Sequence, residues 1–186
     1  LKLINNTNPN EYLKKFGEER LSRKDSINTK IEKYFKGAKK RKILSNRVLE
    51  KIKKYVTSNL DVLEENKMAL VHWDVHLENF LVGNGRIVGM LDFERTDYLS
   101  IDYVLDFVRR MRDYPEVYAS EKYERLVKKE DYRNLFDWYK EFYPELFDFD
   151  NLETRLNLYS IKYDLLLLLD WPKTKSLKRR IRTYLN

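Results

Sequence analysis

A short β-hairpin pattern inside an otherwise helical sequence constrains the fold of this chain most. Two apolar runs, Phe80–Val82 and Ile87–Leu91, flank the turn Gly83-Asn84-Gly85, and this arrangement is typical of a hairpin. One hairpin is too small to build a sheet-based core on its own. We therefore expect a mainly α fold with a small β-hairpin (α+β), in which the hairpin serves a local purpose.

Apolar residues at helical spacing predict helices on both sides of the hairpin. Ahead of it, the strongest pattern runs from about Ser45 to Glu65 and can be capped by Ser45 or Asn46. A brief apolar run, Met68–Val71, follows. Beyond the hairpin we expect helices at about Ile101–Arg112, Pro115–Lys129, Asp131–Phe142, Leu152–Leu169 and Leu177–Leu185.

The amino-acid composition limits the cellular environment and the fold class that we expect for this chain. The chain has no cysteine, which excludes disulfides and fits a reducing cytoplasm, so we expect a cytoplasmic protein. Its longest apolar run, Leu165–Leu169, is too short to span a bilayer, and we expect no membrane span. The five Gly and four Pro in 186 residues favour long helices over a turn-rich β fold.

Charge is distributed unevenly along the sequence. Residues 1–60 carry a net charge of +11, residues 61–172 carry −10, and the last segment, from Lys173 on, has six basic residues and no acidic one. A pI near 9.3 suggests a nucleic-acid partner, but the acidic middle argues against one. The basic run Lys33–Lys54 is interpreted as a solvated helical face.

Polar residues bracket the hairpin at spacings that carry a chemical meaning. Asp74 and Asn79 are five positions apart, and Asp92 follows Asn79 by thirteen. A short loop can present Asp74 and Asn79 at its two ends, and a hairpin then returns the chain so that Asp92 emerges beside them. Two carboxylates and one amide oxygen form a hard-oxygen set that suits Mg²⁺ bound together with phosphates.

This arrangement resembles a known family. The order His72-x-Asp74-x-x-x-x-Asn79, a hairpin and then Leu91-Asp92 is similar to the catalytic and metal-binding set of kinase-fold enzymes. The details resemble the aminoglycoside phosphotransferase and choline kinase branch of small-molecule kinases. His76 stands two residues after Asp74, as in that branch.

Two further stretches bear on this resemblance. Asp92-Phe93-Glu94 stands where protein kinases have Asp-Phe-Gly, and Asp102 to Phe107 loosely matches the Asp-Pro-x-x-Asp-Leu stretch of the branch. The sequence departs from the pattern in two places. Trp73 replaces a small Gly, which could crowd the loop, and the later stretch lacks its Pro.

The resemblance implies roles for these residues. Asp74 would orient the acceptor hydroxyl and take its proton, and Asn79 and Asp92 would hold Mg²⁺ bridging the phosphates of ATP or another NTP. A zinc site at His76 is disfavoured, because the chain has only two His and no Cys. The residues expected to support the catalytic loop are His72, His76, Glu94, Asp102 and Asp106.

The resemblance also implies a domain organisation. Residues 1–186 would form the C-terminal lobe of a protein-kinase-like fold: residues 1–66 as the helical part after the hinge, 67–98 as catalytic loop and hairpin, and 99–186 as the helical body. No strand-rich, glycine-containing segment precedes the catalytic loop. We therefore expect the N-terminal ATP-binding lobe to be absent from this chain, and the isolated chain to be inactive.

Three functions remain open at this point. The first is an ATP- and Mg²⁺-dependent phosphotransferase acting, in the full-length protein, on a hydroxyl of a small molecule such as an aminoglycoside or amino alcohol. The acidic middle would attract a cationic substrate, although the basic tail argues against an aminoglycoside. The second is a non-catalytic kinase-fold binding module that lacks the ATP lobe. The third is a nucleic-acid-binding protein that uses the basic N-terminal region.

Overall fold

The computed structural model describes residues 1–16, 23–64, 67–119 and 125–185. The chain forms two compact units, each built from two separate stretches of sequence. The first, called the mixed unit, comprises Leu1–Gly17 and Lys67–Phe149. The second, called the helical unit, comprises Glu18–Asn66 and Asp150–Asn186.

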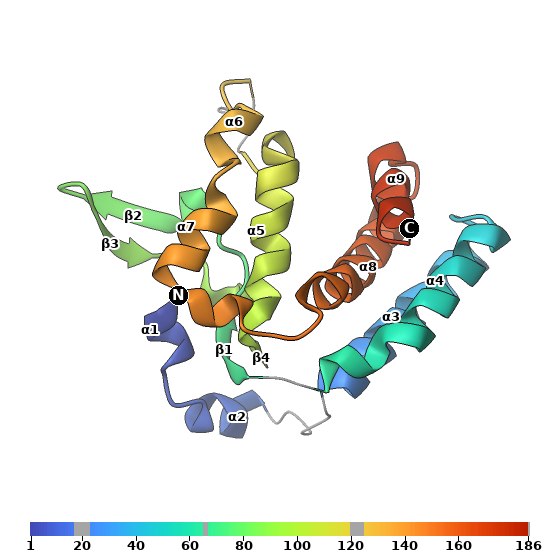
Figure 1. Cartoon of the computed structure of the whole chain (residues 1–186), viewed down its shortest axis with the longest axis horizontal. Coiled ribbons are helices and arrows are strands. Elements are labelled where there is room, and N and C mark those ends of the chain that lie inside the picture. Colours follow the sequence, from blue (N-terminus) through green and yellow to red (C-terminus); the bar gives the residue numbers. More distant parts are fainter. Residues whose placement is uncertain (17–22, 65–66, 120–124, 186) are drawn as a thin grey trace. The chain divides into compact units, whose positions relative to one another are not determined.

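The mixed unit contains both β-sheets and several short helices (Figure 1). Its strands are β1 Met68–His72, β2 Phe80–Gly83, β3 Arg86–Met90 and β4 Thr96–Ser100. Its α-helices are α1 Lys2–Asn5, α2 Asn10–Phe16, α5 Val104–Asp113, α6 Lys129–Tyr132 and α7 Leu135–Phe142. Its 3₁₀ turns are η2 Leu77–Asn79, η3 Phe93–Arg95, η4 Ile101–Tyr103, η5 Pro115–Val117 and η6 Pro144–Phe147.

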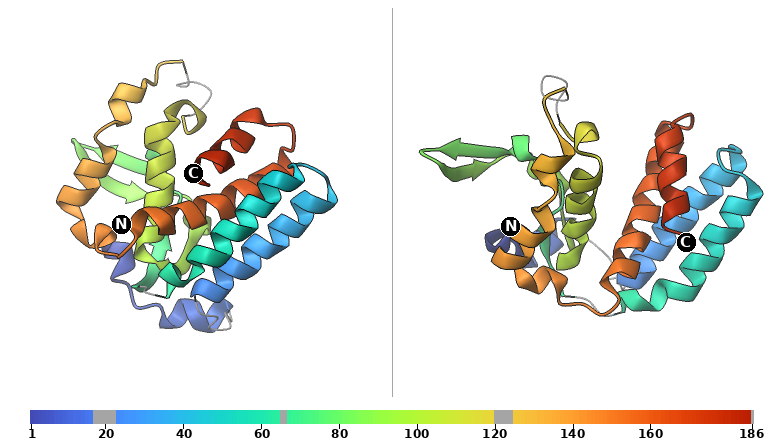
Figure 2. Two further views of the ribbon diagram at one scale, coloured as in Figure 1. Left: turned by 45° about the vertical axis from the view of Figure 1, so that its right-hand side comes forward. Right: turned by 45° about the horizontal axis from the view of Figure 1, so that its top comes forward.

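The described part of the helical unit contains helices only (Figure 2). Its elements are α3 Arg23–Lys40, α4 Asn46–Asn59, η1 Leu60–Leu63, α8 Leu152–Asp170 and α9 Lys175–Thr183. None of the helices in the described ranges combines the length and the apolar character that crossing a membrane requires. The predicted mainly α fold with a small hairpin is confirmed.

The hairpin lies where the sequence predicted it. β2 and β3 pair antiparallel with Phe80 opposite Met90, and a bulge interrupts the register after Leu81. The turn is tighter than expected: Gly83 belongs to β2, and the loop is only Asn84-Gly85. Both loop residues have positive φ, at 52° and 71°, and Asn-Gly is the pair that such two-residue turns favour.

A second two-stranded sheet was not predicted. β1 pairs antiparallel with β4, in a register that runs from Met68 opposite Ser100 to His72 opposite Thr96. The apolar run at β1 gave a local signal, but β4 has a partner 24 to 32 positions earlier in the chain. Such long-range pairing leaves no periodic trace in a five-residue segment.

Two of the predicted helices are wrong in part. In the described residues of 115–129 there is only the turn η5 and the first residue of α6; residues 120–124 lie outside the described part. Val117 and Leu126, the large aliphatic side chains of the described part of this segment that are exposed, bury no surface that could stabilise a helix there. The predicted helix Asp131–Phe142 is broken between Tyr132 and Leu135.

Helices α4, α8 and α9 match their predicted positions closely. Helix α8 is mostly buried and packs along α3, where Gly37 allows the close approach: a Cβ at this position would lie 3.0 Å from Leu169 Cδ2. Ser45 caps α4, because its Oγ accepts a hydrogen bond from the Val48 N–H at 3.4 Å. Helix α8 ends at Asp170, two residues before Pro172, as expected from the missing N–H of proline.

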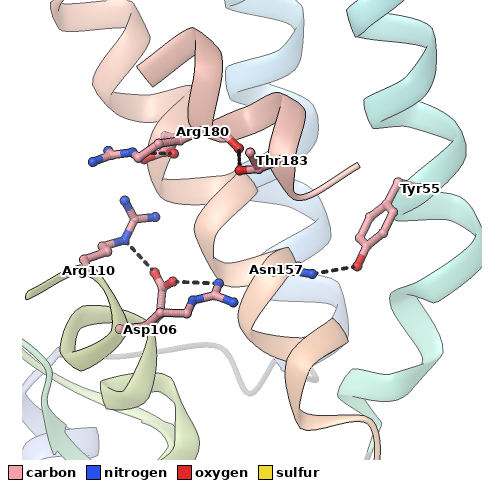
Figure 3. A network of polar contacts seen from close by, with 8 residues as sticks. Tyr55, Asp106, Arg110, Asn157, Arg180 and Thr183 are labelled. Atoms are coloured by element: carbon pink, nitrogen blue, oxygen red, sulfur yellow. Dashed lines mark hydrogen bonds and ion pairs between the residues drawn. The ribbon is translucent and has the colours of Figure 1, made fainter. Parts of the chain in front are cut away.

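Buried polar groups link the helices of this unit. The Arg180 guanidinium on α9 donates two hydrogen bonds to the Asp164 carboxylate on α8, at 2.7 and 3.2 Å, and both side chains are almost fully buried. Asn157 Nδ2 donates to Tyr55 Oη at 3.3 Å, joining α8 to α4 (Figure 3). A buried ion pair is costly to break because it leaves an uncompensated charge inside the protein.

Replacing Asp164 by Ala should therefore destabilise the chain strongly. The buried Arg180 would lose its counter-charge and both hydrogen bonds, and we expect a loss of about 3–5 kcal/mol in the free energy of unfolding. Urea denaturation of both proteins measures it. Asp170→Ala, at the exposed end of the same helix, is the control and should change stability by no more than about 0.5 kcal/mol. A loss below about 1 kcal/mol for Asp164→Ala would contradict this account of the pair.

Candidate functional site

The β1–β4 sheet fixes His72 at the start of the loop that carries Asp74 and Asn79. His72 is the last residue of β1 and lies opposite Thr96, the first residue of β4. Its Nδ1 is 3.2 Å from Thr96 Oγ1, and its ring lies 5.6 Å from the Phe93 ring. The imidazole is fully buried. His72 is therefore held from two sides, by the strand that follows the hairpin and by the aromatic residue just before that strand.

Burial sets the protonation of His72. Desolvation lowers its pKa below the usual value of 6.5, and the negative charges of Asp74 and Asp92 oppose this effect. Its Nε2 is buried and has no partner with hydrogen-bond geometry in the described part of the chain. Both carboxylates act on one imidazole, which indicates that the ends of the loop and of the hairpin lie close together.

A hydrogen bond ties Asn79 to Asp74. The Asn79 side-chain amide donates from Nδ2 to the backbone carbonyl oxygen of Asp74 at 3.0 Å. Asn79 ends the 3₁₀ turn η2, in which its backbone N–H donates to the carbonyl of His76 at 2.9 Å. Because Nδ2 is committed to this contact, the amide is held in one orientation, and its other atom, Oδ1, is the oxygen that a cation could use.

A second hydrogen bond brings Asp92 to the same place. The Leu91 N–H donates to the Asn79 carbonyl oxygen at 2.7 Å, extending the hairpin pairing of Phe80 with Met90 by one position. Asp92 follows directly. Its backbone is left-handed, with φ 57° and ψ 56°, which few residues other than glycine adopt and which costs free energy. The side chain of Asp92 is exposed.

The remaining predicted residues lie around this centre. His76 contacts Phe107 of α5 edge to face, with ring centroids 6.4 Å apart. Glu94 is exposed and lies 3.8 Å from Arg95 Nε. Asp102 is fully buried in η4. The contact of His76 with Phe107 anchors the loop to α5.

Asp106 belongs to an ion-pair cluster within α5. Its two carboxylate oxygens lie 3.4 Å from Arg109 Nη2 and 3.0 Å from Arg110 Nε, and all three side chains are largely buried (Figure 3). Spacings of three and four residues place these partners on the same face of a helix. Asp106 therefore stabilises α5, the helix against which His76 packs.

Trp73, the residue that departs from the expected glycine, is accommodated by its neighbours. Its backbone N–H donates to the Arg95 carbonyl oxygen at 3.2 Å, and the Arg95 guanidinium lies 5.5 Å from the indole centroid. The indole also meets the Tyr103 ring edge to face at 6.2 Å. These contacts attach Trp73 to η3 and η4, so its bulk adds to the packing of the loop.

Sequence reasoning missed the residues that support the site from a distance. Thr96 orients His72, and its backbone carbonyl accepts a hydrogen bond from the Tyr12 hydroxyl at 3.3 Å. Tyr12 also donates to Asp97 Oδ1 at the same distance. Tyr12 lies 84 residues before Thr96, so no spacing rule could have found it. Thr96 could have been found only from the pairing of β1 with β4.

The donor set defines what the site can bind. Asp74 and Asp92 supply carboxylates and Asn79 an amide oxygen, which suit a hard cation such as Mg²⁺. In the described ranges, no group of three or more His, Cys, Asp and Glu side chains could hold a metal ion. A magnesium ion here would therefore need oxygens from phosphates or water to complete its coordination, as it does in nucleotide-dependent sites.

Comparison with known proteins identifies the family. No curated protein and no solved structure matches the chain. A model of the phosphotransferase enzyme family, APH, matches residues 15–141, about two thirds of the chain. That stretch includes the loop, the hairpin and Asp92. The predicted resemblance is thus confirmed, and the chain belongs to the phosphotransferase enzyme family.

Proposed function

We propose that this chain supplies the catalytic and metal-binding residues with which the full-length protein transfers the terminal phosphoryl group of ATP, or of another nucleoside triphosphate, to a hydroxyl of a small molecule with the help of Mg²⁺. The observation that carries the proposal is the pair of hydrogen bonds at Asn79. One runs from its side chain to Asp74 and the other from Leu91 to its backbone. Together they bring the backbone of Asp74, of Asn79 and of Leu91, the residue before Asp92, close to one another, which supports assigning the three oxygen-bearing side chains to one site.

Asp74 is proposed to act on the acceptor. Its carboxylate orients the hydroxyl and takes its proton as the oxygen forms a bond to the transferred phosphorus, while the bond from phosphorus to the leaving nucleoside diphosphate breaks. Such phosphoryl transfer depends mainly on positioning and charge stabilisation. A positioned general base contributes about 10²–10⁴-fold to the rate.

Asn79 and Asp92 are proposed to hold Mg²⁺. Asn79 would use Oδ1, because its Nδ2 is bound to the Asp74 carbonyl, and Asp92 would use its exposed carboxylate. The bound ion supplies positive charge against the phosphate oxygens. The left-handed backbone of Asp92 supports this role, since strained backbone is often retained where it directs a functional side chain.

The surroundings of the site support a nucleotide and a cationic acceptor. The hairpin that precedes Asp92 exposes Leu81, Val82, Ile87 and Val88, and these side chains offer an apolar surface to a nucleotide base. From position 74 to 97 the sequence holds five acidic and two basic residues. Their field would attract an aminoglycoside or an amino alcohol.

Replacing Asp74 by Asn should abolish most of the transfer while sparing nucleotide binding. A screen of aminoglycosides and amino alcohols with the full-length protein and radiolabelled ATP identifies the acceptor and so tests the proposal itself. With that acceptor, we expect Asp74→Asn to lower kcat about 10²–10⁴-fold and to change the KM for ATP little. Steady-state kinetics measure both parameters.

Glu78→Gln is the matched control for Asp74→Asn. Glu78 is an exposed carboxylate of the same loop, and its loss should leave kcat within about twofold, as for a surface substitution away from such features. If Asp74→Asn retained the wild-type rate, Asp74 would have no part in the mechanism. If no acceptor in the screen were labelled, the proposed acceptor class would be wrong.

The metal requirement should depend on Asp92 and Asn79 jointly. Asp92→Ala removes a charged ligand and Asn79→Ala a neutral one, so both should raise the Mg²⁺ concentration needed for half-maximal activity, Asp92→Ala more strongly. Because both residues serve one ion, the double variant should lose less than the sum of the single losses. Activity titrated with Mg²⁺ measures this, with the exposed Asp137→Ala as control. An unchanged requirement in Asp92→Ala would exclude this site.

The neutral state of His72 should make stability depend on pH. Its folded-state pKa lies below the ordinary 6.5, so the unfolded chain binds a proton first as pH falls, and stability present above pH 6.5 is lost below it. The free energy of unfolding should decline from pH 7 to 5.5 by at most about 1.4 kcal/mol per pH unit for this group. His72→Gln should weaken the decline. Equal slopes in wild type and His72→Gln would contradict this account.

A further inference from the structure

The positive charge of the chain is concentrated in the unit that the proposed phosphotransfer does not use. Over their whole sequences, the helical unit carries a net charge of +10 and the mixed unit −3. The basic N-terminal stretch and the basic C-terminal stretch are far apart in the sequence. They belong to the same unit for most of their length, which raises the question of what their charges do together.

Two basic turns meet at one end of the helical unit (Figure 2). The turn from α3 to α4 contacts the end of α8, where the Arg41 guanidinium donates to the Leu169 carbonyl oxygen and Gly37 packs on the Leu169 side chain. The turn from α8 to α9 begins two residues later. The surface formed here, called the basic tip, comprises Lys39, Lys40, Arg41, Lys42, Arg47, Trp171, Lys173 and Lys175.

The cations of the basic tip are not neutralised within the described part of the chain. All seven are exposed, and none of them has a carboxylate within ion-pair distance there. Elsewhere in the same unit the pattern differs, because Lys24 bridges Asp61 and Glu64 at 2.5 and 2.7 Å. Asp170 is the only acidic residue in the sequence segments that form the tip. Its cations are therefore available to an external anion.

Two of these cations, Lys42 and Lys175, lie at positions where they do not stabilise the helix ends. Lys42 has a φ of 52° at the end of α3, where Ile43 N–H donates to the Ala38 carbonyl at 3.0 Å. Helices that end in this way favour Gly or Asn at the left-handed position. Lys175 begins α9, and a cation at a helix N-terminus is electrostatically unfavourable. Cations at positions that favour other residues break a local rule, and such exceptions are expected at functional sites.

Trp171 adds an aromatic surface to the tip. It is 58% exposed, and among the described residues of the helical unit it is the one large hydrophobic side chain that is exposed. A helix that lies on a membrane presents a whole apolar face, which this surface lacks. One exposed indole surrounded by cations instead fits a nucleic acid, whose phosphates bind Lys and Arg and whose unpaired bases stack on aromatic rings.

We propose that the basic tip binds single-stranded nucleic acid, with Lys and Arg contacting phosphates and Trp171 stacking on an unpaired base. The inference is independent of the proposed phosphotransfer, because none of its residues belongs to the catalytic loop, the hairpin or the residues predicted to support them. It gives a role to the two basic segments whose charge the enzymatic site leaves unused.

The test measures binding of a fluorescently labelled 12-nucleotide single strand, as RNA and as DNA, to the whole chain by anisotropy at several NaCl concentrations. Lys173→Gln/Lys175→Gln should weaken binding about 25-fold at 0.1 M NaCl, since each lost phosphate contact with a single strand changes the salt exponent by about 0.7. The magnitude of the salt slope should fall by about 1.4. Binding weaker than about 1 mM at 50 mM NaCl would overturn the proposal.

Matched variants test whether binding depends on the basic tip itself or only on the net charge of the chain. Lys53→Gln/Lys54→Gln removes the same charge from exposed positions further along α4 and should weaken binding less than about threefold. Trp171→Ala should weaken it about tenfold or more, and Trp171→Phe much less, because stacking needs an aromatic face. Equal losses in both lysine variants, or no loss in Trp171→Ala, would overturn the proposal.

Lys42→Gly distinguishes binding from folding. Gly suits the left-handed position better than Lys, so the variant should keep or raise the melting temperature while binding the strand about fivefold more weakly at 0.1 M NaCl. Unchanged binding in this variant would remove Lys42 from the surface. Vesicles containing anionic phosphatidylserine provide the last arm: if they bound the chain more tightly than the oligonucleotide does, the basic tip would be a membrane surface and the proposal would be wrong.

Discussion

The pairing of β1 with β4 is the constraint on which the candidate site depends. The two strands bring His72 and Thr96 opposite each other. The segment between them, which contains the loop, the hairpin and Asp92, therefore starts and ends at the same place. A closed segment of 23 residues would be free to adopt many conformations if its ends were not fixed. The pairing fixes them, and the Tyr12 hydroxyl contacts the Thr96 carbonyl from the N-terminal part of the chain.

Within this closed segment, hydrogen bonds to backbone carbonyls and one left-handed residue set the positions of the functional residues. The bonds from Asn79 to Asp74 and from Leu91 to Asn79 set where the three oxygen-bearing side chains begin. The left-handed turn at Asp92 then sets where its carboxylate leaves the backbone. An isolated two-stranded hairpin is marginally stable in water, so β2 and β3 also rely on the fixed ends for their position. The buried His72 and the Phe93 ring beside it complete this support.

The helical unit differs from the mixed unit in how its interior is stabilised and how its surface is charged. Its interior is held by α8, by the bidentate Asp164–Arg180 pair and by the Tyr55–Asn157 hydrogen bond, whereas its surface carries most of the positive charge of the protein. Residues such as Lys42 and Lys175 occupy positions where other residues would stabilise the helix ends better. The unit thus combines a strongly specified core with a surface whose charges its own fold does not require.

The sequence by itself determined the elements whose signals are local. The β-hairpin around Gly83–Gly85, the apolar stripe and Ser45 cap of α4, and the long apolar helix α8 were all predictable, as were the spacings of Asp74, Asn79 and Asp92 that led to the family. Tertiary structure alone decided the rest. β4, Thr96 and Tyr12 act through partners 24 to 85 positions away, and the predicted helix after Pro115 failed because no surface covers Val117 and Leu126. The basic tip likewise exists only where α8 packs on α3. Local hydrogen bonds and periodicity can be read along a chain, but burial and long-range pairing depend on which segments meet in space.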